Sequence, residues 1–202
     1  KRGFVALVLR YHIAPVGYPG PFADAARAVR LARAKASELG IDPERLGMIG
    51  FSAGAHLTGM TGFKPNQTQD AEDDLIGKYS ARPNRIVLAY APIGAVHGRE
   101  RSAHHFVGAS NPAEIEEAMN VISGIDSSAP PTFIYHTQPD EKVPVENAMK
   151  LASACAANGV PFALHVYPNC KHGTVMGQRF PEVASWAGLL EDWLADWGMI
   201  KA

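Results

Sequence analysis

The sequence predicts an α/β fold in which a mainly parallel sheet carries helices on both faces. Short apolar runs alternate with longer amphipathic segments along the 202 residues, and glycine- and proline-rich turns separate them. The length suffices for one domain with a substantial core. The sequence contains no repeat, low-complexity tract or interdomain linker. We therefore expect one domain over residues 1–202.

Five apolar runs are predicted to form the strands. Residues 4–10 are continuously apolar and rich in β-formers, as a strand covered on both faces would be. A helical segment separates this run from the next, which predicts a parallel pair. The five expected strands cover residues 4–10, 46–49, 86–91, 132–136 and 162–167.

Amphipathic segments between these runs predict the helices. Residues 22–39 place alanine, valine and leucine at helical spacing opposite arginine and lysine, and Gly40 follows as a helix stop. Residues 93–131 form an irregular excursion, with a short helix begun by Asn111 and Pro112, that we expect to line the active site. A polar loop with a short helix is expected at 63–84, and further helices at 53–60, 145–157 and 182–197.

The composition argues against several function classes. Nineteen basic and twenty acidic residues give a net charge of −1, so no charge excess points to nucleic acid or an anionic membrane. No apolar run approaches the roughly 18 residues of a membrane helix. Cys155 and Cys170 lack metal-ligand spacing, so separate thiols are favoured, with a disulfide between them as the alternative. We expect no cofactor and no metal; an acidic group at Asp70, Glu72, Asp73 and Asp74 is the weak alternative.

The segment Gly50-Phe51-Ser52-Ala53-Gly54 is the strongest chemical signal in the chain. It follows a buried-strand pattern and precedes a helix of small residues. A serine at such a strand–turn–helix junction is exposed above the strand ends, and the flanking glycines permit the tight turn. The next helix directs its N-terminal N–H groups toward the serine. The alternative is a tight glycine turn with an incidental serine.

Two further residues complete a candidate catalytic triad. In a parallel sheet, functional groups gather at the carboxyl ends of the strands. Asp140 follows the fourth expected strand and His172 follows the fifth. An imidazole can take the proton of Ser52, and a carboxylate can fix the imidazole's tautomer.

Other acids and histidines compete for these roles. Asp126 precedes the fourth strand and Glu141 adjoins Asp140, so both are weaker candidates for the acid. A structural hydrogen bond is favoured for His136 and a packing or capping role for His56. His165 is expected to be a packed or surface residue. His104 and His105, in a loop that also holds His97, are alternatives as pocket-lining or merely exposed residues.

The motifs resemble α/β-hydrolases of the esterase/lipase branch, especially bacterial carboxylesterases and acetyl-xylan-esterase-like carbohydrate esterases. The resemblance implies an α/β-hydrolase fold with Ser52 as nucleophile, His172 as general base and acid, and Asp140 as orienting carboxylate. It also implies that the Ala53 N–H donates to the oxyanion. The matching segments are residues 10–15, 41–46, 50–57, 136–145 and 167–173.

The chain departs from this family at its N-terminal side. The family's His-Gly-Gly-Gly-type segment, which supplies further oxyanion N–H groups, is absent from the sequence, as are the family's first strands. His12 stands where the family usually has arginine. We therefore expect an N-terminally incomplete hydrolase fold that associates through exposed strand edges. A substitute N–H from residues 11–20 is the alternative.

These observations predict a serine esterase that cleaves short acyl esters, with acetylated carbohydrate as one candidate substrate. The expected partner is a small-molecule ester. Two other functions stay open at this point. One is a serine peptidase or amidase of the same fold, and the other is an inactive hydrolase-fold binding module.

Overall fold

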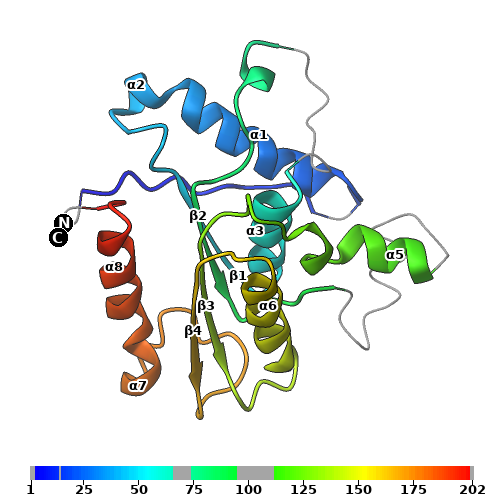
Figure 1. Ribbon diagram of the computed structural model, residues 1–202, viewed down its shortest axis with the longest axis vertical. Coiled ribbons are helices and arrows are strands. Elements are labelled where there is room, and N and C mark those ends of the chain that lie inside the picture. The colour runs from blue at the N-terminus through cyan, green and yellow to red at the C-terminus, as the bar shows by residue number, and fades with distance from the viewer. Residues whose placement is uncertain (1–2, 14, 66–73, 95–111, 201–202) are drawn as a thin grey trace.

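A four-stranded parallel sheet forms the centre of the protein. The computed structural model describes residues 3–13, 15–65, 74–94 and 112–200. The strands lie in the order β1-β2-β3-β4, and each neighbouring pair is parallel. All strands therefore end at the same edge of the sheet (Figure 1). The strands are β1 (Gly47–Phe51), β2 (Arg85–Ala89), β3 (Thr132–Thr137) and β4 (Phe162–Tyr167).

Helices cover both faces of this sheet, as the sequence predicts. Helices α1, α3 and α6 lie on one face, and α7 and α8 lie on the other (Figure 1). This arrangement confirms the predicted fold class. The helices are α1 (Gly20–Ala34), α2 (Ala36–Leu39), α3 (Ala53–Phe63), α5 (Pro112–Met119), α6 (Glu146–Ala157), α7 (Pro181–Ala184) and α8 (Trp186–Asp196), with 3-10 turns at Ile76–Lys78 and Ile122–Gly124.

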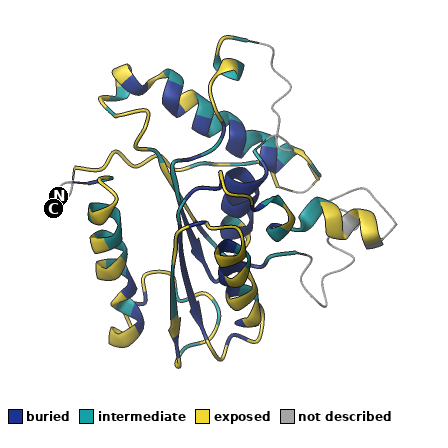
Figure 2. Ribbon diagram, in the orientation of Figure 1, coloured by how far each residue is buried: buried dark blue, intermediate teal, exposed yellow. Residues whose placement is uncertain are grey.

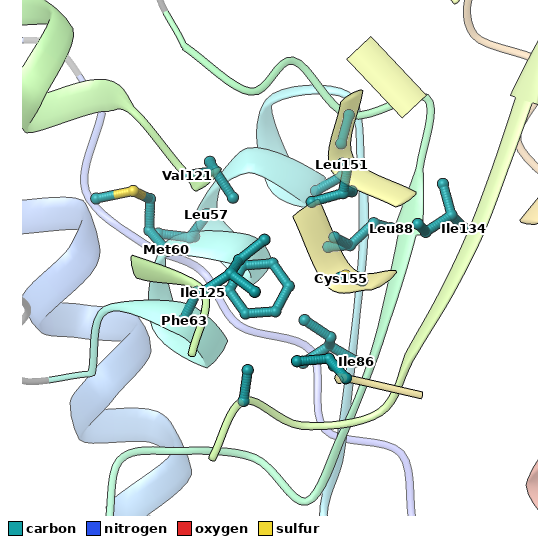
Figure 3. Packing of buried hydrophobic residues seen from close by; sticks show 14 of the residues in the cluster. Leu57, Met60, Phe63, Ile86, Leu88, Val121, Ile125, Ile134, Leu151 and Cys155 are labelled. Carbon is teal, nitrogen blue, oxygen red and sulfur yellow. The ribbon is translucent and has the colours of Figure 1, made fainter. Parts of the chain in front are cut away.

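Alternate residues of the central strands supply two separate cores. Ile86 and Leu88 of β2 pack with α3 on one face, in a cluster that also holds Met60 and Phe63 (Figure 3). On the other face, Tyr135 of β3 stacks on Trp186 with ring centroids 4.6 Å apart. Since both faces are covered, the central strands are buried along most of their length (Figure 2).

The prediction of a strand at residues 4–10 is wrong. The segment has no regular secondary structure, and Leu7 and Val8 are exposed. The predicted parallel pair with residues 46–49 is absent for the same reason. A continuous apolar run indicates burial, but a strand exists only where another strand accepts its backbone hydrogen bonds. Among the described residues, β1 pairs with β2 alone, so β1 is an edge strand with Ile49 exposed.

Two predicted helices are interrupted. The segment at 22–39 is divided into α1 and α2 at Lys35, and the final helix is divided into α7 and α8 at Ser185. Gly40 ends α2 in the left-handed conformation, with φ 65°, as the C-terminal glycine predicts. The strand at 162–167 has the predicted bounds.

Several predictions fall on residues that the structure does not describe. They concern Asp70, Glu72, Asp73, Asn111 and the loop histidines at 97, 104 and 105. Of the excursion at 93–131, only residues 93–94 and 112–131 are described. The single domain over 1–202 therefore stays a prediction, as does association through the β1 edge.

The described residues also bear on membranes, metals and thiols. None of their helices combines the length and apolarity needed to cross a bilayer. They hold no group of three or more potential ligands for a metal ion. Asp74 instead pairs with Arg27 of α1, which holds the pKa of that carboxyl well below its ordinary value. Cys155 and Cys170 are both free thiols.

A close backbone approach joins β1 to α3. A Cβ atom on Gly50 would lie 2.0 Å from the carbonyl oxygen of Gly54 and 2.5 Å from the backbone nitrogen of Ala55. A Cβ on Gly54 would meet no described atom within 4 Å. The two glycines of the motif thus differ: the first is required by packing, and the second is not.

We predict that Gly50→Ala lowers the free energy of unfolding by about 2 kcal/mol or more, because the added methyl would push the end of β1 away from the first turn of α3. Gly54→Ala, the matched control, should change it by less than about 1 kcal/mol, since alanine favours helix over glycine. Urea denaturation followed by circular dichroism measures both. Equal effects of the two substitutions would contradict the packing argument.

Candidate active site

Ser52 lies at a sharp turn between β1 and α3. Its backbone has φ 54° and ψ −119°, a positive-φ conformation that a residue other than glycine rarely adopts. The surrounding backbone holds it there. The Ser52 N–H donates to Ala89 O of β2 at 3.0 Å, and the Ser52 carbonyl accepts from the N–H groups of Ala55 and His56. The turn thereby projects the serine at the carboxyl end of β1.

Ala53 occupies the position that the resemblance predicts for an oxyanion donor. It is the first residue of α3, and it directly follows Ser52. The N–H groups of a helix's first turn have no acceptor within the helix, and they lie at the positive end of its dipole. Ala53 therefore offers a backbone donor beside the serine.

The structure brings Ser52, His172 and Asp140 into one chain of hydrogen bonds. Ser52 Oγ lies 2.8 Å from His172 Nε2. His172 Nδ1 lies 2.6 Å from Asp140 Oδ2. The serine and histidine are 120 residues apart in the sequence, and each of the three follows the carboxyl end of a strand. This is the geometry in which an imidazole can take the hydroxyl proton.

The carboxylate of Asp140 is buried, and both of its oxygens have hydrogen-bond partners. Its Oδ1 accepts the N–H groups of Lys142 and Val143, each at 3.0 Å. Its other oxygen faces His172. A buried carboxylate is costly unless such donors satisfy it, and backbone donors also fix its orientation.

His136 lies beneath this loop and is completely buried. Its Nε2–H donates to Val143 O at 2.8 Å, and Nε2 lies 3.4 Å from Asp140 Oδ2. Burial lowers the pKa of His136, which favours the neutral ring. His136 thus links β3 to the end of the turn that carries Asp140. This is the structural hydrogen bond that the sequence favours.

The BD-FAE family model matches residues 1–155, more than half of the chain. The chain belongs to the BD-FAE family. Several of the solved structures that the chain resembles are named as esterases or other hydrolases, which confirms the resemblance that the motifs suggest.

Individual relatives of this BD-FAE chain are named for ester and xylan chemistry. A bifunctional acetyl ester-xyloside hydrolase from Caldicellulosiruptor lactoaceticus is 36% identical, with TM-score 0.85, over 94% of this chain and 70% of that one. Endo-1,4-beta-xylanase B of Butyrivibrio fibrisolvens is 31% identical over 93% of this chain, and an acetylxylan esterase of Xylanibacter ruminicola is 27% identical over 89%. The chain spans 30% and 36% of these two curated relatives.

The other candidate acids, Asp126 and Glu141, have different surroundings. Asp126 accepts hydrogen bonds from the backbone and hydroxyl of Ser128 in an exposed turn, and these bonds lower the pKa of its carboxyl. Glu141 is exposed beside Asp140. The geometry favours Asp140, because its carboxylate is the one that contacts His172 among the described acids.

The other described histidines serve the scaffold of this BD-FAE chain. His56 is buried in α3 and donates from Nε2 to Met119 O at 2.7 Å, which ties α3 to the end of α5. His165 packs its ring against Phe133 in the sheet. His12, where the resemblance leads one to expect arginine, contacts Asp24 of α1 through its ring and its N–H.

Aromatic residues that the sequence did not single out surround His172 and its loop. Tyr90 packs its ring against the His172 imidazole. Tyr135 and Trp186 both donate to Val175 O in the loop that follows the histidine. Tyr90 directly follows β2, and a position at the carboxyl end of a strand could have indicated a place near the site. The positions of Tyr135 and Trp186 in the sequence carry no such indication, because only the fold brings them to this loop.

A groove of about 540 Å³ lies between Tyr18 and α5, where Glu114 and Glu117 line it. Ser52, Asp140 and His172 are not among its lining residues. Glu117 also pairs with the buried Lys64 at 3.5 Å. We therefore assign no substrate-binding residue to this groove.

Buried neutral histidines give a testable pH dependence of stability. Burial lowers the pKa of His56, His136 and His165 in the folded state. Below about pH 6.5 these histidines bind protons in the unfolded chain but stay neutral in the folded chain, so the free energy of unfolding falls as pH falls. We predict a loss approaching about 1.4 kcal/mol per pH unit for each fully buried histidine between about pH 6.5 and 5.

The variant His56→Gln isolates one of these groups. Glutamine still offers an N–H donor to Met119 O but does not titrate, so the loss of stability between about pH 6.5 and 5 should be smaller than in the parent. Urea denaturation at several pH values measures it. Parallel pH profiles of parent and variant would show that His56 does not contribute.

Proposed function

We propose that this protein is a serine esterase that hydrolyses short-chain acyl esters through an acyl-enzyme. Ser52 is the nucleophile, His172 the general base and acid, and Asp140 the orienting carboxylate. The observation that carries the proposal is the continuous chain of hydrogen bonds, with 2.8 Å from Ser52 to His172 and 2.6 Å from His172 to Asp140. Membership of the BD-FAE family supports the same chemistry.

The reaction runs in two halves. As Ser52 Oγ attacks the ester carbonyl, its proton moves to His172 Nε2, and the imidazolium keeps its Nδ1–H on Asp140. The tetrahedral intermediate collapses, and His172 gives that proton to the leaving alcohol. Water then enters, and its oxygen attacks the acyl carbon while His172 takes one of its protons. The second tetrahedral intermediate collapses with breakage of the bond to Ser52 Oγ, His172 returns the proton to Ser52, and the carboxylic acid leaves.

The negative charge on the tetrahedral oxygen needs N–H donors, and Ala53 is the donor that we assign. Its place at the start of α3 supports this role. A second donor would come from a His-Gly-Gly-Gly-type segment, which the 202 residues do not contain. Loss of one donor costs about 10²–10³ in turnover. We therefore expect slow turnover from these residues alone.

Acetylated carbohydrate is the substrate class that we propose for the whole protein. Two of the relatives are named as an acetylxylan esterase and an acetyl ester-xyloside hydrolase. An aminoacyl amide is the competing substrate, because the same triad attacks both bonds. Comparison of p-nitrophenyl acetate and acetylated xylan with an aminoacyl anilide separates the two.

We predict that a fluorophosphonate probe labels Ser52 in the folded chain. A phosphonate traps a serine whose hydroxyl proton is withdrawn by a neighbouring base. Mass spectrometry of peptides identifies the labelled residue, and Ser52→Ala and urea-unfolded protein are the controls. A folded parent that takes up no label would favour the inactive binding module instead.

The two neighbouring acids give a matched pair of variants. Asp140→Asn should lower the turnover of p-nitrophenyl acetate by about 10⁴-fold, because the imidazole then loses its tautomer-fixing partner. The exposed Glu141→Gln should leave turnover within about twofold. Steady-state kinetics measures both. A larger loss from Glu141→Gln than from Asp140→Asn would reassign the acid.

A further inference from the structure

Tyr90 has a strained backbone in a buried position. It directly follows β2, it is almost completely buried, and its φ is 40°. A bulky residue in the left-handed region is an outlier, and such strain persists only where surrounding contacts impose it. Among the described residues other than glycine, Ser52, Cys170 and Val175 share a positive φ. All of these lie at or near the site of Ser52 and His172.

Both ends of Tyr90 are held. Its backbone N–H donates to Tyr135 O in β3 at 2.8 Å. Its hydroxyl accepts the N–H of Val175 at 3.3 Å, within the loop that follows His172. Burial raises the pKa of the Tyr90 phenol, so the hydroxyl stays neutral. The side chain therefore spans from the sheet to the histidine loop.

Between these anchors, the Tyr90 ring contacts the imidazole of His172. The ring centroids are 4.9 Å apart and the planes meet at 72°. The residue before it, Ala89, accepts the Ser52 N–H through its carbonyl at 3.0 Å. Two consecutive residues at the end of β2 thus contact the nucleophile's backbone and the base's ring.

We propose that Tyr90 is a positioning residue, whose ring holds the His172 imidazole in line with Ser52. The inference rests on the proposed esterase function. Asp140 and Ser52 each contact one nitrogen of the imidazole, but these two contacts leave the ring free to rotate about the line that joins them. The Tyr90 ring removes that freedom, because its own position is fixed by β3 and by the histidine loop. A misplacement of about 1 Å can cost about 10²-fold in rate.

Three variants test this role. Tyr90→Leu removes the ring and should lower kcat for p-nitrophenyl acetate and the rate of Ser52 labelling about 10- to 100-fold, with KM within about twofold. Tyr90→Phe keeps the ring and should restore both rates to within about threefold of the parent. Phe133→Leu is the matched control. Phe133 is equally buried on the same face of the sheet but packs against His165 and Trp193.

Equal labelling rates in Tyr90→Leu and Phe133→Leu, at equal unfolding temperatures, would overturn the inference. So would a Tyr90→Phe variant as slow as Tyr90→Leu. Should Tyr90→Leu not fold, Tyr90→Met carries the same expectation, because a flexible methionine fills the space without an aromatic face.

A measurement without turnover separates this inference from the proposed function. NMR of ¹⁵N-histidine-labelled protein reports the hydrogen-bonded Nδ1–H of His172 in parent and variants. We expect that resonance to broaden or vanish in Tyr90→Leu and to persist in Tyr90→Phe and Phe133→Leu. A parent that shows the resonance but takes up no fluorophosphonate would refute the esterase while leaving the positioning role supported. An unchanged resonance in Tyr90→Leu would refute the positioning role alone.

Discussion

The backbone contact between Gly50 and the first turn of α3 is the constraint on which the site depends. Only a residue without a Cβ lets the end of β1 pass so close to Gly54 and Ala55. That approach bends the chain sharply enough to hold Ser52 at φ 54°. The backbone strain is confined to this turn, and the hydrogen bond from Ser52 N–H to Ala89 O anchors the turn to the sheet. A side chain on a rigid strand–helix junction loses little orientation to motion, which suits the role that we propose for Ser52.

The histidine is positioned by a different means. His172 lies on a loop after β4, so its orientation comes from partners on other strands. Asp140 after β3 binds one nitrogen, and the Tyr90 ring after β2 packs against the imidazole. The parallel arrangement brings these groups together, because every strand ends at the same edge of the sheet and β2, β3 and β4 are each followed by one of them. Tyr135 and Trp186 extend the support into the core of the α7–α8 face.

Most elements could be predicted because their signals are local. The apolar run and flanking turns at 162–167 define a strand of those bounds, and Gly40 ends a helix in the left-handed conformation. The run at 4–10 has the same local signal without a pairing partner, and therefore forms no strand. Periodicity likewise gives no warning of the helix breaks at Lys35 and Ser185, since a one-residue irregularity barely changes a helical pattern.

The sequence by itself determined the fold class and the strand–turn–helix around Ser52, and it favoured Asp140 and His172 as partners, because these signals lie in short motifs and in their positions after the strands along the chain. Only the tertiary structure decided which acid faces the histidine, at 2.6 Å, and that Tyr90 packs against it. It also decided that Gly50, and not Gly54, is the glycine required by packing. These are distances between segments far apart in the chain, and no local pattern encodes a distance across a sheet.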